Sequence, residues 1–251
     1  MRQALALGAL HGPAELLPVS SSAHVALVPQ LLGWPYASLE ASERKSFEVA
    51  AHAGAALGLA WIARRDLGTV RSAILTTLPP ALAGLALERQ VEERFGSRRQ
   101  LALTQVAAGA VLALADRRPA TRPERDAAPL DELAIGAAQA VALIPGVSRM
   151  GAALTVARAR GFERAASSRL ARRAALPVLA GAAALKGARG VSRSLAAPFA
   201  AGAAASLVST LACAPLVRRL DRARSLAPFA AYRAALGAAV LAAGRSASMA
   251  P

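Results

Sequence analysis

Long apolar runs separated by short polar stretches dominate the chain. The uninterrupted runs cover residues 47–63, 72–87, 101–115, 174–185, 195–217 and 226–243, and residues 89–99 form a polar connection. Apolar and polar positions do not alternate within them as they would in a half-buried strand. A helix needs about 20 apolar residues to cross a bilayer, because its backbone N–H and C=O groups must pair within the segment. The pattern therefore predicts an all-α, polytopic membrane protein.

Two further apolar runs, residues 4–19 and 133–144, end in loops instead of charged surface segments. The first contains Glu15 and leads into three consecutive serines, and residues 25–34 return the chain to the surface. The second leads into Pro145 and Gly146. Irregular backbone at membrane depth persists only where protein or a wet cavity surrounds it. We expect each broken run to form a re-entrant helical hairpin.

The two broken runs share a spacing. In each, a glycine is followed three positions later by a polar residue, then by a proline, and three positions after that by a serine: Gly8, His11, Pro18, Ser21 and Gly136, Gln139, Pro145, Ser148. Corresponding interrupted segments in two halves indicate an inverted repeat, with the functional site where the repeats meet. We interpret residues 1–251 as one membrane domain, with a first half (1–115), a polar loop (116–129) and a second half (130–251).

The formal charge of +15 is almost entirely arginine, because Lys45 and Lys186 are the only lysines. Aromatic residues make up only 4% of the chain, so the platforms on which bases stack are scarce. Arginines between apolar runs are typical of membrane proteins, where they face anionic headgroups. We therefore expect membrane lipid and no nucleic acid as partner, while oligomeric state has no signal in the sequence. The single Cys213 excludes an intrachain disulfide.

The first loop carries the richest chemistry. Glu15, Ser20, Ser21, Ser22 and His24 lie within ten residues in an apolar context, where ionisable groups are costly and therefore functional candidates. A carboxylate suits Mg²⁺ or Ca²⁺, hydroxyls bind phosphate oxygens or attack phosphorus, and imidazole transfers protons near neutral pH. The alternative is that the serines cap a helix and His24 is an interface residue. Capping accounts for one serine but hardly for the whole cluster.

The second loop supplies positive charge. Pro145 and Gly146 predict a turn that can direct backbone N–H groups at an anion, and a helix starting at Met150 would add its positive end. Arg149 beside Ser148 offers a planar, permanently charged fork for phosphate oxygens. Together, the two loops contain what phosphoryl transfer requires.

His52 lies within the run 47–63, one helical turn after Glu48. The spacing places both side chains on one helix face. They either line the same cavity as the loops, or Glu48 sits at the water boundary and pairs locally.

These residues resemble the undecaprenyl-diphosphate phosphatase family, the bacitracin-resistance type of integral membrane enzyme. Residues 11–24 read HGPAELLPVSSSAH and resemble the first signature of that family, and residues 139–151 read QAVALIPGVSRMG and resemble the second. Weaker similarities, including Tyr232 and Arg233, extend the resemblance over essentially the whole chain. It implies two re-entrant loops meeting in a pocket of a bacterial inner (cell) membrane protein. There, the terminal phosphate of a C55 polyprenyl diphosphate is removed so that the lipid carrier returns to cell-wall synthesis.

The resemblance also assigns roles to individual residues. It implies catalytic roles for Glu15, Ser21, His24 and Arg149, and substrate-binding roles for Ser20, Ser22, Gln139, Gly146 and Ser148. The implied cofactor is a divalent metal, usually Mg²⁺ or Ca²⁺, held by Glu15 and the residue at position 11.

Several positions depart from the family pattern. His11 stands where the family has a glutamate, His52 where a glutamine is usual, and Met150 where a serine is usual. Arg172 and Arg173 replace apolar residues. Imidazole binds softer divalent ions and suits Mg²⁺ and Ca²⁺ poorly. Two alternatives to hydrolysis therefore stay open: a polyprenyl-phosphate flippase or transporter that uses the same groups only for binding, and a catalytically impaired homologue.

Overall fold

A computed structural model of the chain describes residues 1–64, 67–187 and 193–248. These residues form α-helices and short 3-10 turns but no β-strand, and one isolated bridge joins Arg122 to Phe162. The α-helices are α1 (Arg2–Leu16), α2 (Ser21–Leu31), α3 (Ala41–Ile62), α4 (Val70–Arg94), α5 (Arg98–Asp116), α6 (Pro129–Val141), α7 (Arg149–Ala159), α8 (Arg164–Gly187), α9 (Arg193–Ala212), α10 (Ala214–Asp221) and α11 (Ala227–Ser248). The all-α prediction is confirmed.

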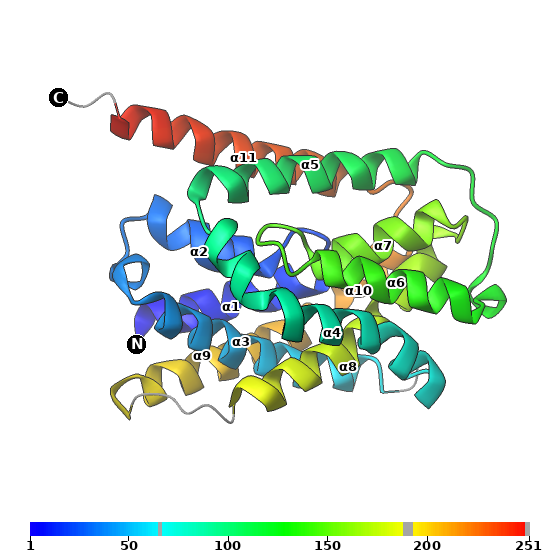
Figure 1. Cartoon of the computed structure of the whole chain (residues 1–251), viewed down its shortest axis with the longest axis horizontal. Helices are drawn as coiled ribbons and strands as arrows, with labels where there is room; N and C mark the ends of the chain where they lie inside the picture. Colours follow the sequence, from blue (N-terminus) through cyan, green and yellow to red (C-terminus); the bar gives the residue numbers. More distant parts are fainter. Residues whose placement is uncertain (65–66, 188–192, 249–251) are drawn as a thin grey trace.

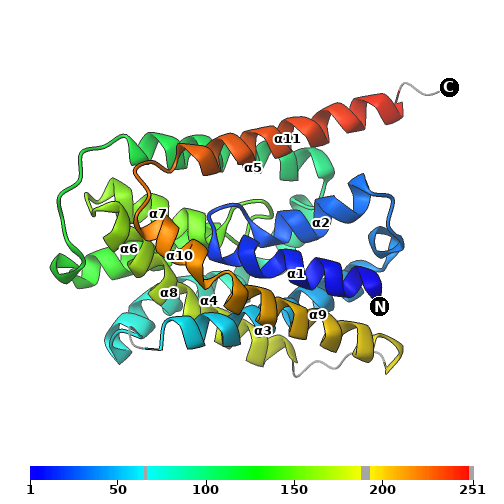
Figure 2. The same cartoon turned by 180° about the vertical axis from the view of Figure 1, so that it is seen from behind.

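Two helix pairs, α1 with α2 and α6 with α7, occupy the middle of the molecule (Figure 1). Helices α5 and α11 lie side by side along one edge, and α3, α8 and α9 lie on the opposite side of the two pairs (Figures 1 and 2). This arrangement places the loops that join the central pairs inside the protein.

Proline and local hydrogen bonds end the helices at both central loops. Leu17, which precedes Pro18, adopts φ −106° and ψ 155°, the extended conformation that a following proline favours. Ser20 follows with φ +73°, and its hydroxyl accepts a hydrogen bond from the backbone N–H of Ala23 at the start of α2. At the second loop, Gly146 has φ +94°, a conformation that glycine adopts at no steric cost.

Small residues allow the helices to approach closely. A Cβ atom built on Gly8 of α1 would lie 2.1 Å from the carbonyl oxygen of Gly202 in α9. A Cβ atom on Gly136 of α6 would lie 2.7 Å from the carbonyl oxygen of Leu75 in α4. Such contacts are typical of membrane helices, which associate through close packing instead of through the hydrophobic effect.

In the part of the chain that the structure describes, two helices are long and apolar enough to cross a bilayer by themselves. Windows of 18 residues at Val70–Leu87 and Leu195–Ala212 have mean hydropathies of 1.4 and 1.6, and less than a quarter of each window is buried inside the protein. Exposed large apolar side chains also occur on other helices, among them Leu57, Leu114 and Val141. The outer surface thus presents apolar side chains where a soluble protein would present polar ones.

Three expected boundaries were wrong. α4 continues to Arg94 into the connection expected at 89–99, because its glutamates, glutamine and arginines are good helix formers despite their polarity. α8 begins at Arg164, well before the apolar run at 174–185, for the same reason. The run 195–217 is divided at Cys213, and a proline in the first turn of α10 starts the new helix.

The polar loop is anchored at the start of α6. The Arg122 guanidinium donates to both carboxylate oxygens of Asp131, at 3.2 and 2.8 Å, and Arg160 also pairs with Asp131. Burial raises the pKa of Asp131, but hydrogen bonds from Arg122, the Ala128 N–H and Arg160 outweigh it and lower the pKa to about 2. The loop is therefore held to the ends of α6 and α7 by a carboxylate that stays ionised at neutral pH.

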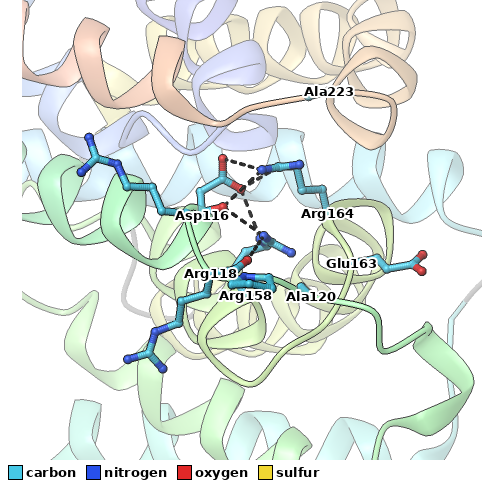
Figure 3. Close-up of a pocket in the computed structure, with 9 residues that line it drawn as sticks. Asp116, Arg118, Ala120, Arg158, Glu163, Arg164 and Ala223 are labelled. Atoms are coloured by element: carbon cyan, nitrogen blue, oxygen red, sulfur yellow. Dashed lines mark hydrogen bonds and ion pairs between the residues drawn. The ribbon is translucent and has the colours of Figure 1, made fainter.

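A second buried carboxylate organises the neighbouring surface, where a cavity of about 500 Å³ opens beside Asp116. Figure 3 shows Arg158 and Arg164 directed at Asp116, whereas Glu163 points away. Asp116 Oδ1 accepts from Arg158 Nε at 3.1 Å and from Arg164 Nε at 2.7 Å, and Oδ2 accepts from the N–H of Leu226 at 2.8 Å. The arginines that face this cavity are paired with Asp116, so their structural role explains why charged groups line it.

Candidate active site at the two central loops

Glu15, in the last turn of α1, is the centre of the candidate site. The Ser21 hydroxyl donates to Glu15 Oε2 at 2.5 Å, and His52 Nε2 lies 3.3 Å from the same oxygen. Arg149 Nη2 lies 3.9 Å from the other oxygen, Oε1. One buried carboxylate thus joins groups from α1, α2, α3 and α7, and the two predicted loops meet at it.

The three serines of the first loop have different positions. The Ser20 hydroxyl caps α2 and lies 3.2 Å from the Ser22 hydroxyl, whereas Ser21 faces Glu15. The capping alternative is therefore correct for Ser20. Only Ser21 has its hydroxyl hydrogen-bonded to an acceptor that can take its proton.

The second loop directs Arg149 at the same centre. The Ser148 hydroxyl accepts from the N–H of Gly151 at 3.0 Å and so caps α7, which begins at Arg149 as the sequence predicted to within one residue. Arg149 Nη1 is buried and has no hydrogen-bond partner among the described residues. A buried N–H group without a partner is costly, so it is available to an anionic ligand.

Arg233 of α11 connects the two loops. It is almost completely buried, and its guanidinium donates to three carbonyl oxygens: Pro18 at 3.1 Å, Gly146 at 2.9 Å and Gln105 at 3.2 Å. In the sequence, Arg233 stands out only within the family resemblance, without an assigned role. The argument that selected Glu15, an ionisable residue inside an apolar run, applies equally to Arg233 in the run 226–243 and could have found it.

Both ring nitrogens of His24 are occupied. Nδ1 lies 2.6 Å from the Ser20 carbonyl oxygen and Nε2 lies 2.6 Å from the Tyr232 hydroxyl oxygen, with the two rings stacked. Because a carbonyl only accepts, Nδ1 carries the proton and Nε2 accepts from Tyr232. In this arrangement His24 fixes the Ser20 turn against α11, and its catalytic role stays a prediction.

Gln139 bridges helices. Its side-chain nitrogen donates to the carbonyl oxygens of Thr76 at 3.1 Å and Ala174 at 3.2 Å, which belong to α4 and α8. The amide donors of Gln139 are therefore engaged with the backbone, and its substrate-binding role stays a prediction.

His11 and Glu15, the predicted metal ligands, lie together and are joined by His52. One ligand atom from each of the three residues falls within a group whose members are no more than 4.8 Å apart. The donor set is two imidazole nitrogens and one carboxylate. Mg²⁺ and Ca²⁺ take oxygen ligands, so these residues do not fit the hard cation that the resemblance implied.

The fold and these two loops define a helical protein in which a carboxylate, a hydroxyl and a guanidinium meet at two broken helices. A model of the family described as bacitracin resistance protein BacA matches residues 4–239. An undecaprenyl-diphosphatase of Geobacter sulfurreducens is 40% identical over 265 residues, which cover 95% of this chain and 96% of that protein. The undecaprenyl-diphosphatases of Pelobacter propionicus and Pelotomaculum thermopropionicum are each 37% identical, and each alignment covers 95% of both chains.

The chain belongs to the BacA family of bacitracin resistance proteins. The resemblance carried by the two loops is thereby confirmed over nearly the whole length. Family membership also makes the chain a membrane protein, in agreement with its two long apolar helices.

Proposed function

We propose that this protein hydrolyses the terminal phosphate of a polyprenyl diphosphate, of the undecaprenyl class, and so returns the lipid carrier to cell-wall synthesis. The observation that carries the proposal is the hydrogen bond from Ser21 to Glu15, with Arg149 beside the other carboxylate oxygen. Phosphoryl transfer needs a nucleophile, a proton acceptor and positive charge around the phosphate oxygens. The names of the relatives from Geobacter and Pelobacter support the same substrate class.

The site residues divide the reaction between them. The unpartnered N–H group of Arg149 binds terminal phosphate oxygens, assisted by the start of α7 and by the Gly146 turn. Glu15 takes the proton from Ser21, and the Ser21 oxygen attacks the terminal phosphorus. The bond from phosphorus to the bridging oxygen breaks, and its electron pair leaves with the polyprenyl phosphate. Water then hydrolyses the phosphoserine and releases inorganic phosphate.

Phosphate release by purified protein in detergent, from a polyprenyl diphosphate, tests the proposal. We expect Arg149→Ala and Ser21→Ala each to lower kcat by more than about 100-fold, which is the usual cost of losing a group that stabilises the transition state. Arg118→Ala is the matched control, because Arg118 is an exposed arginine on the polar loop. Normal turnover in Arg149→Ala would contradict the site assignment.

The same preparation, in liposomes, separates hydrolysis from transport. Hydrolysis predicts phosphate release in both detergent and liposomes. Transbilayer movement of a polyprenyl phosphate without any phosphate release would instead establish a flippase, and the absence of both activities would establish a catalytically impaired homologue.

We further propose that the chain is a single multi-pass domain of the bacterial inner membrane with two re-entrant hairpins related as an inverted repeat. Corresponding residues of the two hairpins support this. His11 of α1 contacts Ser206 of α9, and Gln139 of α6 contacts Thr76 of α4. Gly8 and Gly136 make the matching close approaches to α9 and α4, and a serine caps the returning helix of each hairpin.

Cysteine labelling tests the topology. In a Cys213→Ser background, which removes the only native thiol, Arg2→Cys and Leu130→Cys place single thiols at the exposed starts of α1 and α6. An inverted repeat places these two positions on opposite sides of the membrane, so a membrane-impermeant maleimide added to sealed cells should label only one of them. Equal labelling of both would contradict the proposed topology.

A further inference from the structure

The hydrogen bonding of His52 leaves a lone pair facing a carboxylate. His52 Nδ1 lies 2.7 Å from the carbonyl oxygen of Glu48, and because a carbonyl only accepts, Nδ1 carries the proton. In the neutral ring, Nε2 is then an acceptor. It faces Glu15 Oε2, another acceptor, at 3.3 Å. Two acceptors at this separation repel unless a proton or a metal cation lies between them.

His11 directs a second nitrogen at the same oxygen. His11 is completely buried, and its Nδ1 lies 3.2 Å from the Ser206 hydroxyl. Its Nε2 is also buried, has no hydrogen-bond partner among the described residues, and lies 3.9 Å from Glu15 Oε2. The rings of His11 and His52 meet edge to face, with centroids 4.5 Å apart. Two imidazole nitrogens, Nε2 of His11 and Nε2 of His52, therefore converge on one carboxylate oxygen.

These separations suit a small, borderline-soft cation. Zn²⁺ bonds of about 2.0–2.1 Å in a tetrahedron place neighbouring ligand atoms about 3.3 Å apart. The separations from Glu15 Oε2, 3.3 Å to His52 and 3.9 Å to His11, approach this value. All three ligand atoms lie within 4.8 Å of one another, so the side chains would draw together around a bound ion. Two imidazoles with one carboxylate are also a donor set of catalytic Zn²⁺ sites, which keep a further position for water or substrate.

The surroundings of the two histidines are typical of metal ligands. Histidines that bind a metal usually donate their second ring N–H to a carbonyl or another polar group, which fixes the ring and its tautomer. Glu48 supplies such a carbonyl to His52, and Ser206 supplies a hydroxyl to His11. Arg149 approaches the other carboxylate oxygen of Glu15. The hydrogen bond from Ser21 uses one of the two lone pairs of Oε2, so the second lone pair can bind an ion.

We propose that His11, Glu15 and His52 bind a divalent cation of the Zn²⁺ class in place of Mg²⁺ or Ca²⁺. The inference rests on the proposed function where it assigns this ion to the phosphatase site. Binding of the ion itself can be measured without turnover. Positions 11 and 52 are the two at which this chain has histidine where the resemblance gives the family an oxygen donor. Both differences bring nitrogen donors to the same carboxylate, that of Glu15.

The test uses full-length protein in detergent, prepared without a histidine tag, in a Cys213→Ala background and stripped with a chelator. Titration calorimetry with Zn²⁺, Co²⁺, Mg²⁺ and Ca²⁺ gives affinities, and the visible absorption of Co²⁺ reports the ligand geometry. We expect one Zn²⁺ or Co²⁺ per chain, a tetrahedral Co²⁺ spectrum, and Zn²⁺ binding at least about 100-fold tighter than Mg²⁺ binding.

Variants identify the ligands. His11→Ala and His52→Ala should each weaken Zn²⁺ binding by more than about 100-fold, and Ser206→Ala by about 10–100-fold as the loss of an outer partner. His24→Ala is the matched control, because it removes the remaining one of three histidines in the chain and both its nitrogens are already engaged. If an alanine variant does not fold, His11→Glu with His52→Gln replaces it, and that pair should shift preference from Zn²⁺ to Mg²⁺ or Ca²⁺.

Two outcomes would overturn the inference: Zn²⁺ binding that is unchanged in His11→Ala and His52→Ala, or wild-type protein that binds neither Zn²⁺ nor Co²⁺. Failure of the proposed function has a different result. Hydrolysis supported by Mg²⁺ without any Zn²⁺ binding rejects only the ion, whereas tight Zn²⁺ binding with no phosphate release under any metal rejects only the activity.

Discussion

Substitution of Arg233 by lysine tests whether one buried guanidinium holds the two loops in register. Arg233 donates to the carbonyl oxygens of Pro18, Gly146 and Gln105, and so ties both loops to α5. A lysine ammonium is a point donor on a different stem and cannot reproduce the planar fork. If it keeps one of the three contacts, two hydrogen bonds to a charged group are lost, each worth about 1.5–3 kcal/mol.

The expected loss is therefore about 3–6 kcal/mol of interaction that positions the loops. If half of the upper value, about 3 kcal/mol, is lost from the stabilisation of the transition state, kcat for phosphate release falls by about 100-fold. Steady-state phosphate release in detergent measures this rate, and a thermal melt of the same sample separates loss of alignment from loss of fold. We expect Arg233→Lys to remain folded, with a lower melting temperature.

Arg98→Lys is the control for the general effect of exchanging arginine for lysine. Arg98 is exposed and makes one side-chain hydrogen bond, to Gln30 at 2.8 Å. Its replacement should change the free energy of unfolding by no more than about 0.5 kcal/mol. The reasoning is refuted if Arg233→Lys keeps kcat within about threefold of wild type and melts together with the Arg98 variant.

Two further predictions concern packing and pH. Gly8→Ala should lower the melting temperature sharply, because its Cβ would lie 2.1 Å from a backbone oxygen of α9. Gly84→Ala, whose Cβ would have nothing within 4 Å, should be neutral or stabilising by up to about 1 kcal/mol. Equal melting temperatures of the two variants would contradict the packing argument. The pKa of Asp131 is lowered to about 2 in the folded protein, so its stabilising effect is complete above its unfolded pKa of about 3.9 and is lost as pH falls towards 2. Melting temperature should therefore fall with pH in this range more steeply for wild type than for Asp131→Asn, and parallel curves would reject the assignment.

The local features of this protein follow from patterns along the chain. Apolar runs gave the helices, since a backbone in an apolar environment must pair its own polar groups. The break at Pro18 agrees with the preference of a residue before proline for extended backbone. Prolines inside other helices, such as Pro79 and Pro80 in α4, show that this preference does not decide a break, and α6 already ends at Val141, before Pro145. Glu15, the three serines and Arg149 could be selected from sequence because each is a polar group beside a break between apolar segments, where its cost requires a reason.

Which of these groups meet depends on how helices distant in sequence pack together. Ser21 faces Glu15 while its neighbour Ser20 caps a helix, a difference that depends on one backbone turn with φ +73°. Gln139, which occupies the position in its hairpin that His11 occupies in the other, is turned to the backbone of α4 and α8. Residues from distant helices complete the site: His52 adds a nitrogen to Glu15, and Arg233 joins the loops. Spacing along the chain describes neighbours within one helix, whereas the packing of helices far apart in sequence sets the distances between these groups.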